Sequence, residues 1–284
     1  MKEKDCVLLL TACVNPYNMV YTKLVDPEIR KKQYLDAVDY YYHNTKYRIV
    51  ICNNTGDDFQ GLFSYYSNER FEYIFFEGNK YDALLGKGYG EFEIIKYALS
   101  NSQLINKHDY IIKVTGRLII PNVVKNISYT QRAISLSPNS VLARFERNTS
   151  VVHSECFAGP KAFFRLFISQ ENLINDSKHY YFEHLLYDTL LTGEFCYYSF
   201  LKPQKIIGVS GTHNSVYKND YESFMNQYMD IYCFLLQHKN CKSVGYSSRK
   251  IKYYTYKIHT LIRIIKYIRK YILNRPLANE KEGW

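Results

Sequence analysis

Residues 6–16 read CVLLLTACVNP, a nearly continuous apolar run that ends at Asn15-Pro16. A run of this length and composition indicates a strand buried in the core of a sheet. The Asn-Pro pair predicts that the chain enters a loop at the carboxyl end of this strand. Ligands of open α/β sheets bind at such strand ends, so Thr11 and Asn15 are candidate site residues.

The rest of the chain alternates between helical and extended segments. Asp26-Pro27-Glu28 supplies an N-cap, a proline in the first turn and an acidic residue, which predict a helix from Pro27 to Asn44. Further strands are expected at 48–52, 71–76, 110–114, 140–147 and 205–209, and further helices at 90–101, 159–169 and 180–192. This alternation predicts an α/β fold, a three-layer sandwich with a mostly parallel central sheet. We expect one domain over residues 1–245 and a tail over 246–284.

Most of the net charge of +10 lies near the carboxyl end of the sequence. Nine Lys and Arg residues and no acidic residue occur between Arg249 and Arg275. The last nine residues contribute one Lys and two Glu, which leaves 27 basic and 25 acidic side chains in residues 1–248. A nearly neutral body with a basic tail favours an anionic surface as the partner of the tail, and argues against nucleic acid as a partner.

Cysteine usage and hydropathy favour a cytoplasmic protein. The seven cysteines are an odd number, with neither a Cys-x-x-Cys pair nor a zinc-ligand pattern, so we expect them to be reduced and to bind no metal. His153 and Cys156 lack an evident orienting group, and we interpret their closeness as coincidental. The apolar run 7–10 is too short for a signal sequence or a membrane span.

A glycine-rich segment, GKGYGE at residues 86–91, lies between a predicted strand and a predicted helix. Small residues at a helix N-terminus let backbone N–H groups approach an anion, so a diphosphate is a candidate ligand. The candidate residues are Lys87, Gly88, Tyr89 and Gly90. The spacing fits neither the G-x-G-x-x-G fingerprint nor a Walker motif, and a flexible turn without a ligand is the alternative.

The segment KVTGR at residues 113–117 stands at the end of a predicted strand. Strand alternation places Lys113, Thr115 and Arg117 on one side. Two cations and a hydroxyl at this point predict a site for the phosphates of a leaving group, and Arg117 can bind two oxygens at once. An edge strand with solvated charges is the alternative, which the apolar residues on both sides of the segment disfavour.

The order of these features resembles the GT-A glycosyltransferases over residues 5–215. The shared features are a first strand ending in Thr11 and Asn15, a second ending in Asn53-Asn54, a glycine-rich helix start, and a strand that reaches a polar corner. The resemblance implies transfer of a sugar from a nucleotide-sugar donor to a lipid-linked or polysaccharide acceptor, as in the synthesis of bacterial capsule, O-antigen or lipooligosaccharide. It also implies that Asn53 and Asn54 lie at the donor site.

The sequence departs from that family at the polar corner. Many GT-A enzymes carry Asp-x-Asp there, which binds the divalent metal that holds the nucleotide diphosphate. Here Lys113 and Arg117 would repel a metal, so we expect an enzyme without a metal or other cofactor, in which these cations neutralise the leaving group. A catalytically inactive relative that binds glycans is the alternative.

Acidic residues at the start of a predicted helix are candidate catalytic bases. The segment YFEH at residues 181–184 opens this helix, and inverting GT-A enzymes place an acidic residue at a comparable helix start. Glu183 is the first choice and Asp188 the second, with an ordinary helix-dipole role as the alternative. The polar loop 208–215 is expected to return to the nucleotide site, where His213 would contact phosphate.

Residues 249–275 are predicted to form an amphipathic helix. Apolar side chains recur at alternating spacings of three and four, at Ile251, Tyr254, Ile258, Leu261, Ile265, Ile268 and Ile272. The basic residues around them favour binding to an anionic surface, at the inner face of a bacterial cell membrane. A coiled coil with a second copy is the alternative, which repulsion between nine unpaired basic residues disfavours.

A nucleic-acid-binding protein is the alternative from a different class. The 30 Tyr and 16 Phe residues offer faces for stacking on bases as well as on sugar rings. The nearly neutral body and the lack of standard RNA- or DNA-binding motifs in the sequence count against it. The sequence therefore predicts a peripheral glycosyltransferase of the cytoplasm.

Overall fold

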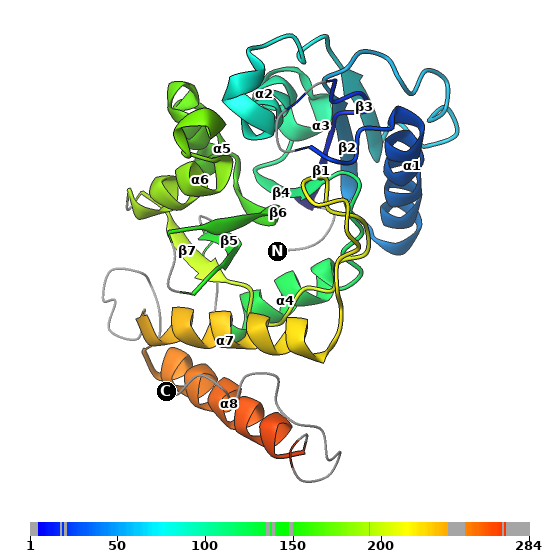
Figure 1. Cartoon of the computed structure of the whole chain (residues 1–284). Coiled ribbons are helices and arrows are strands. Elements are labelled where there is room, and N and C mark those ends of the chain that lie inside the picture. The colour runs from blue at the N-terminus through cyan, green and yellow to red at the C-terminus, as the bar shows by residue number, and fades with distance from the viewer. Residues whose placement is uncertain are drawn as a thin grey trace.

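The computed structural model describes residues 5–17, 19, 22–134, 137, 140–147, 150–192, 194–237, 248–268 and 270. Within them a seven-stranded sheet has the order β3-β2-β1-β4-β6-β5-β7 (Figure 1). The strands are β1 (Cys6–Ala12), β2 (Arg48–Asn53), β3 (Phe71–Phe75), β4 (Tyr110–Thr115), β5 (Ser140–Phe145), β6 (Val152–Pro160) and β7 (Cys196–Ser199). Only β6 among these runs antiparallel to its neighbours, so the expected mostly parallel sheet is confirmed.

Helices cover both sides of this sheet. Figure 1 shows α2, α5 and α6 grouped on one side, and α1, α4 and α7 on the other. The helices are α1 (Pro27–Asn44), α2 (Gly86–Asn101), α3 (Gln103–Asn106), α4 (Val123–Ile134), α5 (Lys161–Ile168), α6 (Phe182–Leu191), α7 (Tyr221–Gln237) and α8 (Ser248–Tyr267). The protein therefore has the mixed α/β architecture that the sequence predicts.

The central strand β1 is buried along its whole length, as its apolar run predicts. It pairs in parallel with β2 and β4, and the register sets Thr11 beside Thr115 and Ala12 beside Asn53. The carboxyl ends of the three strands therefore meet at one edge of the sheet. This is the edge at which α/β folds bind ligands.

Three predicted elements differ from the structure. The first residues of the helix expected at 159–169 complete β6, because Gly159 and Pro160 pair with β4. The strand expected at 205–209 makes only isolated bridges, from Ile207 to Ile119 and from Val209 to Val216. In addition, α2 begins at Gly86 and not at Gly90, so the glycine-rich segment is itself helical.

The basic helix α8 is present and packs on the body. Ile258 and Ile262 are 5% and 4% exposed, and Tyr254 and Ile265 are partly buried against the same core. Figure 1 shows α8 in orange and red alongside α7. The predicted domain boundary at 245–246 and the tail after residue 270 lie outside the described residues. No helix in the described ranges is long and apolar enough to cross a bilayer.

Candidate active site

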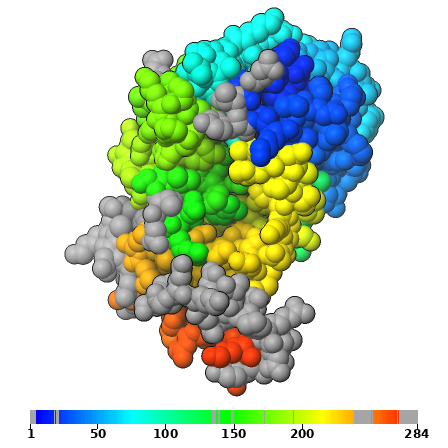
Figure 2. Space-filling view, in the orientation of Figure 1, coloured from blue at the N-terminus to red at the C-terminus, as the bar shows by residue number. Residues whose placement is uncertain are grey.

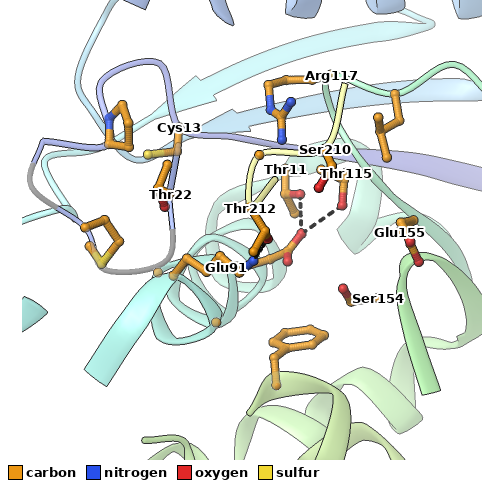
Figure 3. Close-up of a pocket in the computed structure, with 18 of the residues that line it drawn as sticks. Thr11, Cys13, Thr22, Glu91, Thr115, Arg117, Ser154, Glu155, Ser210 and Thr212 are labelled. Carbon is orange, nitrogen blue, oxygen red and sulfur yellow. Dashed lines mark hydrogen bonds between the residues drawn. The ribbon is translucent and has the colours of Figure 1, made fainter. Parts of the chain in front are cut away.

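A cavity of about 590 Å³ opens where the carboxyl ends of β1 and β4 meet the starts of α2 and α6 (Figure 3). Loop 210–218 completes its wall, and Figure 2 shows this loop in yellow against the blue N-terminal part of the chain. The predicted site residues that line the cavity are Thr11, Asn54, Lys87, Gly88, Gly90, Thr115, Arg117, Glu183 and His213. The fold thus brings residues from distant parts of the sequence to one place.

Other predicted residues do not line this cavity, namely Asn15, Asn53, Tyr89, Lys113 and Asp188. Asn53 is fully buried, and its amide donates a hydrogen bond to the carbonyl of Gly56 at 2.8 Å. The hydroxyl of Tyr89 donates to Glu171 at 3.1 Å, and Asp188 accepts from the hydroxyl of a neighbouring tyrosine. These side chains are therefore engaged elsewhere in the fold.

Lys113 lies beneath the cavity and not in it, which corrects the prediction that it contacts phosphate directly. Its side chain is 0% exposed and forms an ion pair with Glu91, a residue of α2. The ammonium also donates to the carbonyl of Ser154 at 2.6 Å. Glu91 in turn accepts hydrogen bonds from Thr11 at 2.9 Å and Thr115 at 3.3 Å, as the dashed lines of Figure 3 mark. The charge of Lys113 is thus neutralised within the protein.

Arg117 is joined in the cavity wall by Arg30, which the sequence reasoning did not find. The two residues are 8% and 5% exposed. Arg30 donates to the backbone carbonyl of Cys13 at 2.8 and 2.6 Å, and Arg117 donates to the carbonyl of Val209 at 2.8 Å. Within the described ranges neither forms an ion pair, and Nε of Arg117 has no hydrogen-bond partner.

The two guanidinium groups lie close enough to affect each other. A Cβ atom on Gly211 would lie 2.8 Å from Nη2 of Arg117 and 4.0 Å from Nη1 of Arg30, so both groups reach the same point of loop 210–218. Burial lowers the pKa of Arg117, and the neighbouring charge of Arg30 adds to that effect. Two buried cations without a carboxylate partner are unfavourable in the free protein and would be compensated by a bound anion.

The glycine-rich start of α2 packs tightly against the protein. A Cβ on Gly88 would lie 3.0 Å from Cβ of Phe182, so the segment admits no side chain there without movement. The carboxylate of Asp176 lies against Gly86 at the same helix start. The side chain of Asp176 thus occupies the place at this helix start where the sequence predicted a diphosphate.

Asp176 is a titratable group of the cavity wall that the sequence reasoning missed. It is 2% exposed, and its Oδ1 atom has no hydrogen-bond partner. Burial, together with the charge of Glu183, raises the pKa of Asp176 to about 6, and the charge of Lys87 opposes the shift. Asp176 and Glu183 therefore form a pair of neighbouring carboxyl groups that line one side of the cavity.

Glu183 lies in the first turn of α6 and lines the cavity, as predicted. Its Oε1 accepts a hydrogen bond from the hydroxyl of Ser154 at 2.6 Å, which fixes one oxygen of the carboxylate. Ser154 belongs to β6, whose pairing with β5 shifts register in this region. Such an irregularity redirects side chains, and here it places Ser154 and Glu155 in the cavity wall.

Glu155 is held as a carboxylate by its neighbours. Burial alone would raise its pKa, but Arg144, at 3.7 Å, and His153 outweigh burial and hold the pKa well below the usual range. His153 is thus engaged with Glu155, at 3.6 Å, while burial raises the pKa of the Cys156 thiol to about 12. The interpretation of His153 and Cys156 as a coincidence agrees with this arrangement.

A second cavity of about 580 Å³ adjoins the first, and Tyr217 and Lys218 line both. Its wall is mostly polar, with Arg144, Asn226 and Asp230 among the lining residues. In the ranges that the structure describes, no group of three or more His, Cys, Asp or Glu side chains is arranged to hold a metal ion.

The residues that sequence reasoning missed share a reason. Arg30 and Asp176 stand among polar residues in the sequence, and Glu91 ends the glycine-rich segment, so all three resemble ordinary residues of helix starts and turns. Arg30 alone carries a sequence signal. It lies four positions before Tyr34 in the predicted helix, so the two side chains share one helix face, and in the structure both are buried.

No protein-family model matches this chain, and no curated protein matches it in sequence. Solved structures with a similar chain course include a candidate nucleotide-diphospho-sugar transferase from Desulfovibrio desulfuricans G20, with a TM-score of 0.41 and 10% identity over 92% of this chain and 98% of that one. A cytidylyltransferase from Leptospira borgpetersenii serovar Hardjo-bovis (strain JB197) gives 0.43 and 12%, over 97% and 100%. A glycosyltransferase involved in the glycosylation of the major capsid of PBCV-1 gives 0.38 and 9%, over 69% and 84%. At these TM-scores and identities the likenesses assign neither a family nor an activity to the chain.

Proposed function

We propose that the protein is a nucleotide-sugar-dependent glycosyltransferase of the GT-A kind, and that its donor binds in the 590 Å³ cavity. One observation carries the proposal: the buried cations Arg30 and Arg117, without a carboxylate partner in the described ranges, face the same cavity as Glu183. A nucleoside diphosphate supplies the anion that this pair lacks. The volume lies within the range of sites that enclose ligands of this size, about 300–1,000 Å³.

The arrangement supports a single-displacement transfer. An acceptor hydroxyl attacks the anomeric carbon of the donor sugar and passes its proton to Glu183, which Ser154 orients. The bond from that carbon to the diphosphate oxygen breaks, and the diphosphate leaves with the electron pair. The negative charge that develops is stabilised by Arg30 and Arg117, which are already fixed by the backbone carbonyls of the loops. The step requires no metal.

The acceptor is proposed to be a glycan, lipid-linked or polymeric, of the bacterial surface. The second cavity supports a hydroxyl-rich acceptor, because polar side chains line most of it and because it shares Tyr217 and Lys218 with the donor cavity. The basic region 249–275 supports a position at an anionic membrane, at the inner face of the cell membrane. Both features suit an enzyme that takes a soluble donor and a membrane-bound acceptor.

Thermal-shift measurements with UDP-, GDP-, CMP- and dTDP-sugars, with and without manganese, test the proposal. A ligand that binds only the native state raises the melting temperature. We expect one nucleotide class to stabilise the protein without manganese, and Arg117→Gln to weaken its binding about 10- to 100-fold, as for loss of a charged hydrogen bond. Arg165→Gln, an exposed change on α5, is the matched control and should leave the shift unchanged.

The other outcomes separate the alternatives. A shift that requires manganese would show that the cations do not replace a metal. The absence of a shift with every nucleotide would favour a glycan-binding protein or a nucleic-acid-binding protein. Glu183→Gln should keep the nucleotide-induced shift but lower the release of nucleoside diphosphate about 10²- to 10⁴-fold, the usual contribution of a general base.

A further inference from the structure

Helix α8 carries an apolar stripe that is already covered by the protein. Its inward side includes Tyr254, Ile258, Ile262 and Ile265, which are buried or partly buried against the core. Aromatic contacts continue this packing, since the rings of Tyr254 and Tyr129 of α4 lie 6.2 Å apart. The stripe that the sequence suggested for a membrane or a coiled coil is therefore largely occupied by the body of the protein.

A second stripe runs along the opposite side of α8, and it is exposed. Tyr253, Tyr256, Ile264 and Tyr267 are 58%, 71%, 50% and 59% exposed. Together with Thr260 they recur at spacings of three, four, four and three residues, which places them on one face of a helix. We call these four large side chains the outward face. An aligned row of exposed rings and a branched aliphatic side chain indicates an interaction surface.

Basic side chains flank the outward face. Lys252, Arg263 and Lys266 are exposed and fall on one flank by helical periodicity, and Lys257 falls on the other. The ammonium of Lys257 lies 5.9 Å from the ring centre of Tyr253. No Asp or Glu occurs anywhere between residues 248 and 270. The partner of this surface must therefore be anionic and must also accept tyrosine rings and an isoleucine.

We propose that the outward face of α8 docks on an anionic lipid bilayer, with the tyrosine rings at headgroup level and the flanking cations on lipid phosphates. Tyrosine is enriched at membrane interfaces because its ring is apolar and its hydroxyl is hydrated. An amphipathic helix in the plane of the interface binds through this combination of apolar area and basic charge. The outward face thus lies on the opposite side of α8 from the apolar stripe that sequence periodicity indicates.

Two other occupants fit less well. A second copy of the chain would bring two sets of basic flanks together without any acidic residue of α8 to pair with them. A nucleic acid would match the charge and could stack on the tyrosines, but it gives no reason for the exposed Ile264, or for Ile268, which is 39% exposed beyond the helix end. A bilayer accounts for the cations, the rings and the aliphatic groups together.

Sedimentation of the full chain with vesicles tests the proposal. We would compare vesicles that contain phosphatidylglycerol with vesicles of phosphatidylcholine alone, at low and high salt. Tyr256→Ser removes the most exposed ring of the outward face, and Tyr65→Ser, at a tyrosine that is 69% exposed elsewhere, is its matched control. The double change Lys252→Gln with Lys266→Gln is matched by Lys80→Gln with Lys107→Gln, which removes two exposed charges far from α8 in the sequence.

We expect the wild type to sediment with the anionic vesicles only. Tyr256→Ser should weaken this binding severalfold, and the α8 lysine pair should weaken it about 30-fold, since each basic residue near an anionic surface contributes about 1 kcal/mol. Both control variants should bind like the wild type. The lack of wild-type binding, or equal effects of test and control variants, would overturn the proposal.

Binding to an oligonucleotide but not to vesicles, with the same dependence on Tyr256, would replace the bilayer by a nucleic acid. A concentration-dependent dimer that the α8 variants abolish would replace it by a second copy. These results are separable from the proposed activity, because no residue of α8 lines the donor cavity. The α8 variants should therefore keep any nucleotide-induced thermal shift in full.

Discussion

Lys113 and Glu91 form an ion pair directly below the cavity, and the lysine has no exposed surface. The same carboxylate accepts hydrogen bonds from Thr11 of β1 and Thr115 of β4, so it ties α2 to the carboxyl ends of two central strands. The rings of Phe157 and Phe182 lie 5.6 and 5.7 Å from the ammonium. Lys113 is thus buried below the site, and among the described residues Glu91 is the one carboxylate that pairs with it.

Glu91→Gln should therefore be strongly destabilising. It leaves the ammonium of Lys113 buried without its carboxylate, which costs about 3–5 kcal/mol in comparable cases. Lys113→Met should cost less, because Glu91 keeps its two threonine donors and is 21% exposed to the cavity. The double variant should be more stable than Glu91→Gln alone, since it leaves no buried charge without a partner. Urea unfolding measures these free energies, provided that the unfolding free energy falls with urea concentration at the same slope in every variant.

The exposed pair Lys32 and Asp36, at 2.9 Å, provides the control. Lys32→Met should change the free energy of unfolding by about 0.5 kcal/mol or less, as for surface ion pairs in general. A Glu91→Gln variant as stable as this control would show that the buried pair is not needed to hold α2 in place.

Arg117→Gln should separate stability from binding. Among the described residues the buried guanidinium has no counter-charge, and its Nε has no partner. Losing the hydrogen bond to the carbonyl of Val209 is therefore offset by the removal of an unpaired buried charge. We expect the free energy of unfolding without ligand to change by about 1 kcal/mol or less, or to rise. Arg30→Gln should cost more, because Arg30 donates to the carbonyls of both Cys13 and Leu24. A large loss of stability in Arg117→Gln would mean that this arginine is mainly structural.

Asp176→Asn should change how stability depends on pH. The folded-state pKa of about 6 exceeds the ordinary 3.8, so the folded protein favours the protonated acid. The stability that the protonated carboxyl group contributes is lost as the pH rises from about 4 to about 6, and it does not return at higher pH. The variant cannot ionise, so it should melt above the wild type at pH 7.5 and close to it at pH 4. An equal difference in melting temperature between variant and wild type at both pH values would contradict this prediction. The exposed change Asp36→Asn is the control, and its difference from the wild type should not grow in this way between pH 4 and pH 7.5.

The elements that could be predicted are those in which local sequence and tertiary burial agree. β1 is an apolar run in the sequence and is buried on every residue in the fold. The helix α1 begins where its cap predicts, because Asp26 accepts hydrogen bonds from the amides of Glu28 and Ile29 at 2.9 and 3.2 Å. Such local signals do not depend on the rest of the chain.

The elements that were missed depend on long-range contacts. β6 contains His153, Ser154 and Glu155, which break any alternation because they serve the cavity and its ion pairs. The site was predicted only in part for the same reason. Strand ends indicate where polar residues gather. The burial of Arg30 and the pairing of Lys113 with Glu91, however, depend on how the helices pack on the sheet, which the sequence alone does not predict.

Gly88→Ala should test how closely α2 must approach α6. The added Cβ would lie 3.0 Å from Cβ of Phe182 and 3.3 Å from its backbone nitrogen, which belong to the stiff start of α6. We expect a loss of about 1–3 kcal/mol from overpacking, despite the better helix propensity of alanine. Gly90→Ala should cost less, since the nearest atoms to its Cβ all belong to the side chain of Tyr81 and none to α6. Because Glu91 and Glu183 are carried by these two helices, a shift of α2 should also weaken nucleotide binding. A Gly88→Ala variant as stable as the wild type in urea unfolding would show that α2 and α6 tolerate a wider separation than the structure has.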